Sequence, residues 1–431
     1  MNVVYFDIDS LRHDHVGTYG YEGPTTPNID SLAEDAVVFE NAYVACSPCM
    51  PSRAGLLTGQ YGIRNGVSTH GPTAQTVRSP KTDKQWFATW AEEWDKGGRE
   101  YLTETRGDSR EWLTLPEVFF HERVHTGAVS SFPRHTAPWF YHLWHEFIQP
   151  QEPDAEGEYM QTPRAETVAD RSIDFLDRTD ESFFLYSQFW DPHAPYWRSE
   201  AEVDRFRDVD LPPYPTADQV ADHQYWDAWS SATQMDIEDL DDLAKVIHEY
   251  DAEIRYADEH VGRVIDRLKA DGIYDETLIV VTGDHGEEFG EHGLYRQHWS
   301  IHEGTQHVPL IIKPPVSAAV SPGRREHLVT NVDMPPTIVD FAGFDIPNAW
   351  QGESLRPILE DASADWRDHI VVDHGLYTAQ RGVVTDQWKF IRTYHPGLWG
   401  GVVPDRQLFD LTEDPYEQDD RATDRTDIVA D

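Results

Sequence analysis

Four residues with side chains that bind ions or move protons each follow an apolar run of strand length. They are Asp9, Arg134, His193 and Asp284. The carboxyl ends of parallel strands meet at one edge of a sheet, so these side chains are expected to converge there. Carboxylates at such an edge can bind a hard divalent cation, and a histidine can act as an acid or a base. The pattern predicts a site with metal-binding and proton-transfer groups.

The most informative stretch is CMPSRAGLLTG, residues 49–59. It matches the sulfatase pattern C-x-P-S-R-x-x-x-L-T-G at all seven specified positions. Cys49 has an arginine four residues later, whereas Met50 holds that position relative to Cys46. On this motif the chain resembles the formylglycine-dependent sulfatase family of the alkaline-phosphatase superfamily.

The resemblance implies a modified nucleophile at Cys49. In that family a formylglycine-generating enzyme oxidises the cysteine to formylglycine, and the hydrate of this aldehyde has two hydroxyl groups. One hydroxyl attacks sulfur, and the other later expels sulfate. An ordinary hydroxyl is a poor nucleophile, but a hydroxyl beside a metal ion can lose its proton near neutral pH. Arg53 is then expected to hold the attacking oxygen and to offset the developing negative charge.

The resemblance also implies metal ligands. Asp9 aligns with the first aspartate of the family's N-terminal strand motif, and Asp284 aligns with the aspartate of its later motif, here TGDHGE. Ser10 stands where many sulfatases have a second aspartate, and His285 stands where many have asparagine. We therefore expect one divalent metal held by Asp9, Asp284, His285 and the oxygen derived from Cys49. Ca²⁺ is the expected ion, and Mn²⁺ or Zn²⁺ is the alternative because a nitrogen ligand suits them better.

Substrate-binding residues are expected in two further segments. His193, in DPHAPY, matches the sulfatase histidine that contacts the sulfate or the leaving oxygen, and the flanking prolines hold it rigidly. In place of the family's GKWH-like segment the chain has Arg134 and His135, in SSFPRH. One of the two is expected to serve, either Arg134 by binding sulfate bidentately or His135 by acting as an acid, and an ordinary surface loop is the alternative.

The segment after GEHG departs from the family. Gln297 replaces the usual lysine, and His298 follows it. We expect His298 to protonate the leaving group, because histidine titrates in the working pH range. The alternatives for that role are His292, His302 and Glu303.

The elements that must position these residues alternate along the chain. Strands are predicted at residues 2–8, 126–132, 182–190, 277–282 and 309–312, and helices at 29–39, 250–270 and 333–343. This alternation predicts an α/β fold with a large, mainly parallel sheet flanked by helices on both faces. From about residue 370, period-2 runs predict a small antiparallel C-terminal subdomain. We place the catalytic domain at residues 1–365 and the subdomain at residues 366–431.

The family resemblance covers nearly the whole chain, apart from residues 73–125 and 200–247. The first of these stretches is polar without a clear period through residue 110, and is interpreted as a surface excursion. The second is acidic and rich in tryptophan, and is interpreted as an insertion over the site. Such stretches usually set substrate choice, so the leaving group is not predicted.

The composition of the chain disfavours some classes of binding partner. The chain has 78 acidic and 35 basic residues and a net charge of −43, which repels nucleic acid and anionic membranes. A charge this large is typical of salt-adapted proteins, so a halophilic host is a hypothesis. The N-terminus lacks a basic stretch followed by an apolar run, and two cysteines are too few for a disulfide framework. A soluble, cytoplasmic protein is expected.

The favoured interpretation is hydrolysis of a sulfate ester or sulfamate on a small molecule or glycan. One alternative is a phosphonate or phosphate ester hydrolase on the same fold, which Ser10 and His285 favour. A second is a catalytically silent binding relative, which the missing lysines allow. A third, weaker alternative is a redox pair of Cys46 and Cys49.

Overall fold

The large sheet is built around the apolar N-terminal run of the chain. The computed structural model describes residues 1–70, 113–132, 143–152, 162–223, 237–400 and 402–430. The sheet has the strand order β11-β2-β10-β7-β1-β6-β4-β5. Its strands are β1 (Asn2–Ile8), β2 (Val37–Tyr43), β4 (His125–Val129), β5 (Glu146–Ile148), β6 (Phe183–Phe189), β7 (Thr277–Gly283), β10 (Leu310–Lys313) and β11 (Gly323–Thr330). Within the described residues, neighbouring strands are parallel except where β10 pairs with β7 and β2, which confirms the predicted mainly parallel sheet.

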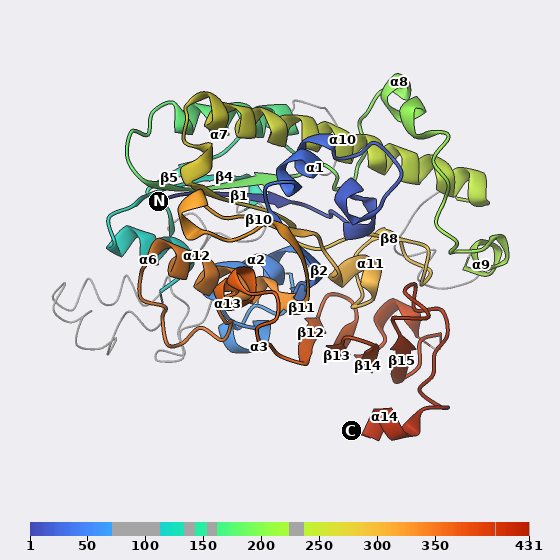
Figure 1. Cartoon of the computed structure of the whole chain (residues 1–431). Coiled ribbons are helices and arrows are strands. Elements are labelled where there is room, and N and C mark those ends of the chain that lie inside the picture. Colours follow the sequence, from blue (N-terminus) through green and yellow to red (C-terminus); the bar gives the residue numbers. More distant parts are fainter. Residues whose placement is uncertain (71–112, 133–142, 153–161, 224–236, 401, 431) are drawn as a thin grey trace, which may run out of the picture.

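Helices cover both faces of this sheet, as predicted (Figure 1). Successive side chains of β1 point to opposite faces, so Val4 and Phe6 pack under one helix layer while Val3 and Tyr5 pack under the other. The first layer contains α1 (Pro27–Ala33), α7 (Ala165–Leu176) and α10 (Leu240–Ala270). The second contains α2 (Cys49–Thr58), α6 (Leu115–His121), α12 (Met334–Ala342) and α13 (Arg356–Glu360).

Helix α10 is longer than the sequence pattern predicts. It was expected to begin at residue 250, but it begins at Leu240, inside the predicted insertion. The reason is a local cap: the Asp239 carboxylate accepts hydrogen bonds from the backbone N–H groups of Asp241 and Asp242 at 2.9 and 3.1 Å.

The predicted helix at residues 29–39 was wrong in its second half. Helix α1 ends at Ala33, and strand β2 begins at Val37. Val37 and Val38 are buried between β10 and β11, where branched side chains pack well on a pleated sheet. Strand pairing therefore determines the structure of these residues, although their sequence has the amphipathic period of a helix.

The C-terminal sheet is antiparallel over most of its width, as predicted. Its order is β15-β14-β13-β12-β3, with β12 (His369–His374), β13 (Ala379–Thr385), β14 (Trp388–His395) and β15 (Arg406–Asp410). The added strand β3 (Cys46–Ser47) comes from the segment just before Cys49 and pairs with β12 in parallel. The C-terminal sheet thus supports the chain at the predicted nucleophile. The domain boundary after residue 365 stays a prediction.

Shorter elements complete the described structure. They are α3 (Gly62–Asn65), α8 (Glu200–Val203), α9 (Ala217–His223), β8 (Glu288–Phe289), β9 (Tyr295–Gln297), α11 (Glu303–Gln306) and α14 (Thr426–Ala430). The surface excursion predicted at residues 73–110 lies outside the described residues. None of the described helices combines the length and the apolar character needed to cross a bilayer.

Candidate active site

Cys49 is the first residue of α2, and it is 5 % exposed. The helix ends at Thr58 and is capped by Gly59, whose φ of +61° lies in the left-handed region that favours glycine. Asn331 holds the chain on both sides of Cys49. Its side chain accepts a hydrogen bond from the Ala45 N–H at 2.9 Å and donates one to the Ser52 carbonyl at 2.9 Å. The position of the thiol is therefore fixed by backbone contacts.

His285 lies directly against Cys49, with 3.0 Å between Nε2 and Sγ. Its other ring nitrogen, Nδ1, is 2.7 Å from the Gly286 carbonyl oxygen. A carbonyl can only accept a hydrogen bond, so we assign the proton to Nδ1, which leaves a lone pair on Nε2. Burial lowers the pKa of His285 to about 4, so the ring is neutral near pH 7.

Arg53 joins three aspartates beneath the thiol. Its guanidinium donates two hydrogen bonds to Asp7, at 2.7 and 3.0 Å, and one to Asp9 at 3.0 Å. It also forms an ion pair with Asp284 at 2.8 Å. Asp7 and Asp9 are two apart along the chain at β1, so both project towards the α2 layer. A fully buried arginine thus organises the carboxylates at the strand ends.

One guanidinium does not balance three carboxylates. Burial and the neighbouring Asp9 and Asp7 raise the pKa of Asp284 well above its usual value, despite the contact with Arg53. Burial also opposes the ionisation of Asp9, but Arg53 and nearby histidines still hold its pKa below the usual value. The site therefore has a deficit of positive charge, which a divalent cation would correct.

The donor set fits such a cation. Ligand atoms of Asp9, Cys49, Asp284 and His285, together the Cys49 cluster, all lie within 4.8 Å of one another. The His285 Nε2 atom is 3.8 Å from Asp9 and 3.6 Å from Asp284. Sequence reasoning expected these four residues to meet, and the structure brings them together.

Ser10 has a different role from the aspartate that many sulfatases have at this position. Its φ of +61° is unusual for a residue with a side chain. The backbone N–H donates to Asp284 at 3.1 Å, and the hydroxyl donates to Asp9 at 3.1 Å. Ser10 therefore orients the two carboxylates as a hydrogen-bond donor.

Further histidines surround the Cys49 cluster. The His298 ring packs 4.1 Å from the His285 ring and 6.0 Å from the His193 ring, measured between centroids. Its Nδ1 atom is 3.3 Å from Glu287. Burial, followed by the neighbouring His285 and His193, lowers the pKa of His298 well below its usual value. An anion bound among these rings would raise that pKa again.

Three nearby residues were not found from the sequence. Asp7 could have been found, because the alternation in FDID puts it on the same face as Asp9. His374 ends β12, and its Nδ1 lies 2.7 Å from the Ser47 hydroxyl. Because β12 pairs with β13 in an antiparallel manner, the rule for parallel strand ends does not find this residue. His70 accepts a hydrogen bond from the Met50 N–H at 3.3 Å, and no local pattern marks it.

The other predicted site residues do not belong to the Cys49 cluster. Arg134 and His135 lie outside the described residues. Glu303 is paired with Lys389 at 2.8 Å. His292 and His302 lie together in a different group with Glu417.

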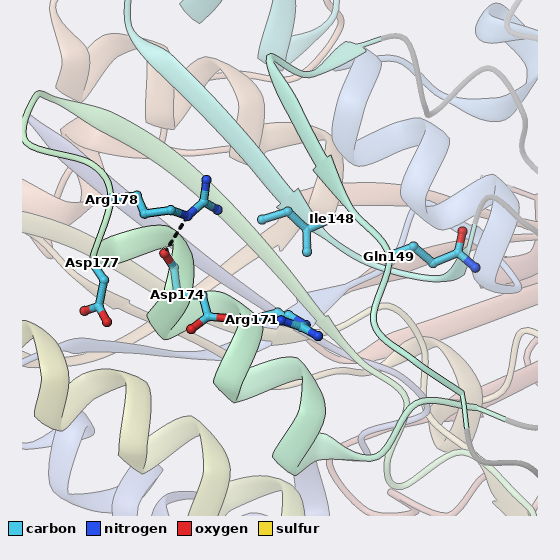
Figure 2. Close-up of a pocket in the computed structure, with 6 residues that line it drawn as sticks. All are labelled: Ile148, Gln149, Arg171, Asp174, Asp177 and Arg178. Carbon is cyan, nitrogen blue, oxygen red and sulfur yellow. Dashed lines mark hydrogen bonds and ion pairs between the residues drawn. The ribbon is translucent and has the colours of Figure 1, made fainter.

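A surface pocket lies apart from the predicted site residues. It is lined by Ile148, Gln149, Arg171, Asp174, Asp177 and Arg178, near the end of β5 and along α7 (Figure 2). The Arg178 side chain donates to the Asp174 carbonyl at 2.9 Å. Of the predicted site residues that the structure describes, none lines this pocket.

The two thiols have the wrong electrostatics for a redox pair. Burial raises the pKa of Cys46, and burial together with Asp9 and Asp284 raises the pKa of Cys49 well above its usual value. Disulfide exchange requires a thiolate, and reactive cysteines have lowered pKa values. This argues against the redox alternative.

Comparison with known proteins identifies the family. A model of the sulfatase family matches residues 1–344. The chain belongs to the sulfatase family. A second model, N-sulphoglucosamine sulphohydrolase, C-terminal, matches residues 290–428. The family prediction is thereby confirmed, and the chain is a sulfatase-family hydrolase of sulfate esters.

Relatives cover nearly the full chain. An arylsulfatase of Clostridium perfringens is 26 % identical over 464 residues, which cover 96 % of this chain and 89 % of that protein. The structure of BT4656 in complex with its substrate D-glucosamine-2-N,6-O-disulfate has a TM-score of 0.76 at 20 % identity, covering 100 % of this chain and 96 % of that one. A phosphonate monoester hydrolase of Agrobacterium radiobacter has a TM-score of 0.72 at 21 % identity, covering 100 % and 93 %. These two structures establish a shared fold.

Proposed function

We propose that the chain hydrolyses a sulfate ester or sulfamate through a formylglycine made from Cys49, assisted by one divalent metal. The observation that carries the proposal is the Cys49 cluster. A buried side chain at the start of α2 lies within 4.8 Å of two strand-end carboxylates and an imidazole lone pair. The sulfatase pattern at residues 49–59 agrees with it.

The Cys49 side chain marks the place of the nucleophile. Its Sγ atom stands in for the carbon-bound oxygens of the formylglycine hydrate. Formylglycine at residue 49 would supply two hydroxyl groups, one to attack sulfur as the leaving group departs and one to expel sulfate as it becomes the aldehyde carbonyl. Water would then restore the hydrate.

Neighbouring side chains provide charge and protons. Despite burial, Arg53 holds the pKa of Asp9 below its usual value, and it would add positive charge next to the attacking oxygen. His298 and His193 are the candidates for contacting the sulfate and protonating the leaving oxygen. His298 is the stronger candidate for the proton, because Glu287 contacts its Nδ1 atom.

We propose Asp9, Asp284, His285 and the oxygen from residue 49 as the metal ligands. A metal bound there would lower the pKa of the hydrate and neutralise negative charge on the sulfate. The carboxylates favour Ca²⁺, and the imidazole lone pair favours Mn²⁺ or Zn²⁺. Metal analysis of the purified protein followed by reconstitution with each ion decides among them.

The substrate is proposed to be a sulfated small molecule or glycan. Support comes from the relatives, which include a protein named choline-sulfatase and one named N-acetylglucosamine-6-O-sulfatase. A cytoplasmic location and a salt-adapted host remain predictions from composition.

The first experiment is mass spectrometry of the peptide that contains residue 49. Formylglycine is lighter than cysteine, so conversion is visible directly. The converted protein is then assayed in parallel on an aryl sulfate and an aryl phosphonate. Turnover of the sulfate is expected. An unmodified thiol in protein made together with a formylglycine-generating enzyme supports the silent relative and contradicts the proposal.

A phosphonate or phosphate ester hydrolase is the second candidate function. The observation that favours it is that Ser10 and His285 differ from the residues many sulfatases have at these positions. Ser10 orients Asp9 and Asp284 through hydrogen bonds and does not add a further carboxylate to the metal site. The same parallel assay separates the candidates. Turnover of the phosphonate alone replaces the first proposal with the second.

A further inference from the structure

A second group of metal-binding side chains lies between the catalytic region and the C-terminal segment. His292 follows β8, His302 directly precedes α11, and Glu417 follows β15. Ligand atoms of these three residues lie within 4.8 Å of one another, and we refer to them as the second cluster. Two neighbouring loops and a segment much later in the sequence thus converge on one point.

His302 has no hydrogen-bond partner for either ring nitrogen among the residues that the structure describes. Its exposed fraction is 1 %, so bulk water does not reach the ring. The aromatic rings of Trp399 and Phe409 pack around it at 5.9 and 6.1 Å. Buried imidazoles normally satisfy at least one nitrogen, because an unpaired buried polar group costs free energy. The ring therefore has an unmet need for a partner.

The two imidazole rings lie close together, and each offers a ligand atom to the same group. They lie face to face, with 3.7 Å between centroids and 16° between planes. The Nε2 atom of His292 is 3.7 Å from Glu417. Protons on both rings would place like charges in contact, whereas one shared cation serves both lone pairs and the carboxylate.

Carboxylates outnumber cations around the second cluster. Lys389 contacts Glu417 at 3.1 Å and Glu303 at 2.8 Å. Glu288 accepts hydrogen bonds from two hydroxyls on one oxygen, and its other oxygen has no hydrogen-bond partner among the described residues. A cation bound at this point would neutralise negative charge that Lys389 does not reach.

We propose that His292, His302 and Glu417 form a second metal site that binds Zn²⁺ or a similar transition-metal ion. Two imidazole nitrogens and one carboxylate oxygen are ligands that zinc prefers, and a water molecule completes four-coordination. The bound ion ties the loop after β8 to the segment after β15, and thereby stabilises the C-terminal region. The site does not depend on the proposed reaction at Cys49.

The test uses full-length protein freed of metal with a chelator and then dialysed against Zn²⁺ alone. Bound zinc per chain is measured by inductively coupled plasma mass spectrometry, and the melting temperature is measured with and without Zn²⁺. The His302→Phe variant keeps an aromatic ring in the pocket and removes both nitrogens. We expect it to bind one zinc fewer than the wild type and to lose the Zn²⁺-dependent rise in melting temperature.

Two controls keep the sites apart. His369→Phe changes an exposed histidine of the C-terminal sheet, and this variant should retain the full zinc content. His285→Ala removes a ligand of the Cys49 cluster and should retain the zinc that His302→Phe loses. Equal zinc content in His302→Phe and the wild type contradicts the proposal, whatever the Cys49 cluster binds.

Wild-type crystals soaked in Zn²⁺ give a result that does not depend on whether the variant folds. Anomalous diffraction at the zinc absorption edge should show a peak between His292, His302 and Glu417. Its absence there overturns the second site, and a peak at the Cys49 cluster leaves the proposed function unaffected.

Discussion

The Cys49 cluster and the second cluster use similar donors in different settings. Both combine histidines with carboxylates, and in both the ligand atoms lie within 4.8 Å of one another. The Cys49 cluster lies at the carboxyl ends of parallel strands and contains the proposed nucleophile beside a buried guanidinium. The second cluster joins loops and has no cysteine. The difference teaches that donor type alone does not separate a reaction centre from a cross-link.

Replacing Cys49, the proposed nucleophile, should have the largest effect on activity and should leave the second cluster unchanged. Cys49→Ala is expected to lower sulfatase kcat by on the order of 10⁴-fold or more, because no group remains to form the covalent intermediate. Zinc bound at the second cluster should not change. Steady-state kinetics and metal analysis measure the two effects. Cys46→Ala, the other buried cysteine, is the matched control and should retain most activity; near-normal turnover by Cys49→Ala would rule out the mechanism.

Removing the guanidinium tests the charge balance of the Cys49 cluster. Arg53→Met is expected to lower the free energy of unfolding by about 3–5 kcal/mol, because buried Asp7 and Asp9 lose their counter-charge. Urea denaturation at neutral pH measures the change. The control is Arg325→Met, since that arginine is also buried but contacts the neutral carbonyls of residues 358 and 359. Arg325→Met should lose less free energy of unfolding than Arg53→Met. An equal loss would contradict the role of Arg53 as the counter-charge of the buried aspartates.

His374 links the C-terminal sheet to the segment before Cys49, and it should make stability depend on pH. Burial lowers its pKa to about 3, so the folded state holds the ring neutral while the unfolded state titrates near 6.5. Its stabilising contribution is present above pH 6.5 and is lost as the pH falls towards 3. Between pH 7 and pH 5 the wild type should lose about 2 kcal/mol more than His374→Gln.

Urea denaturation at the two pH values measures this difference. The matched control is His369→Gln, because His369 is exposed on the same strand. The control should keep the pH dependence of the wild type. If His374→Gln keeps it too, the buried ring is not its source.

The smallest expected effect is at Ser10. Ser10→Ala removes the hydroxyl that donates to Asp9 and keeps the backbone N–H that donates to Asp284. We expect a loss of about 1 kcal/mol in stability and less than about tenfold in kcat. Ser172→Ala removes a buried hydroxyl from α7 on the other side of the sheet and should lower stability without lowering kcat. A large loss of metal in Ser10→Ala would instead make Ser10 a ligand.

Much of the site follows from local sequence. Asp9 and Asp284 meet because each follows a strand of a parallel sheet, and a strand-end rule finds them. The helix predicted at residues 29–39 is wrong in its second half, which shows the limit of periodicity. Pairing with β10 and β11 places Val37 in a strand. The meeting of His302 with Glu417 was not predicted, because no local pattern records which distant loops pack together.

Strand β3 has a consequence for the timing of maturation. Cys49 is nearly inaccessible once the residues before it pair with β12, a strand formed much later in the chain. If Cys49 is converted as we propose, the modifying enzyme would have to reach the thiol before these later segments close over it.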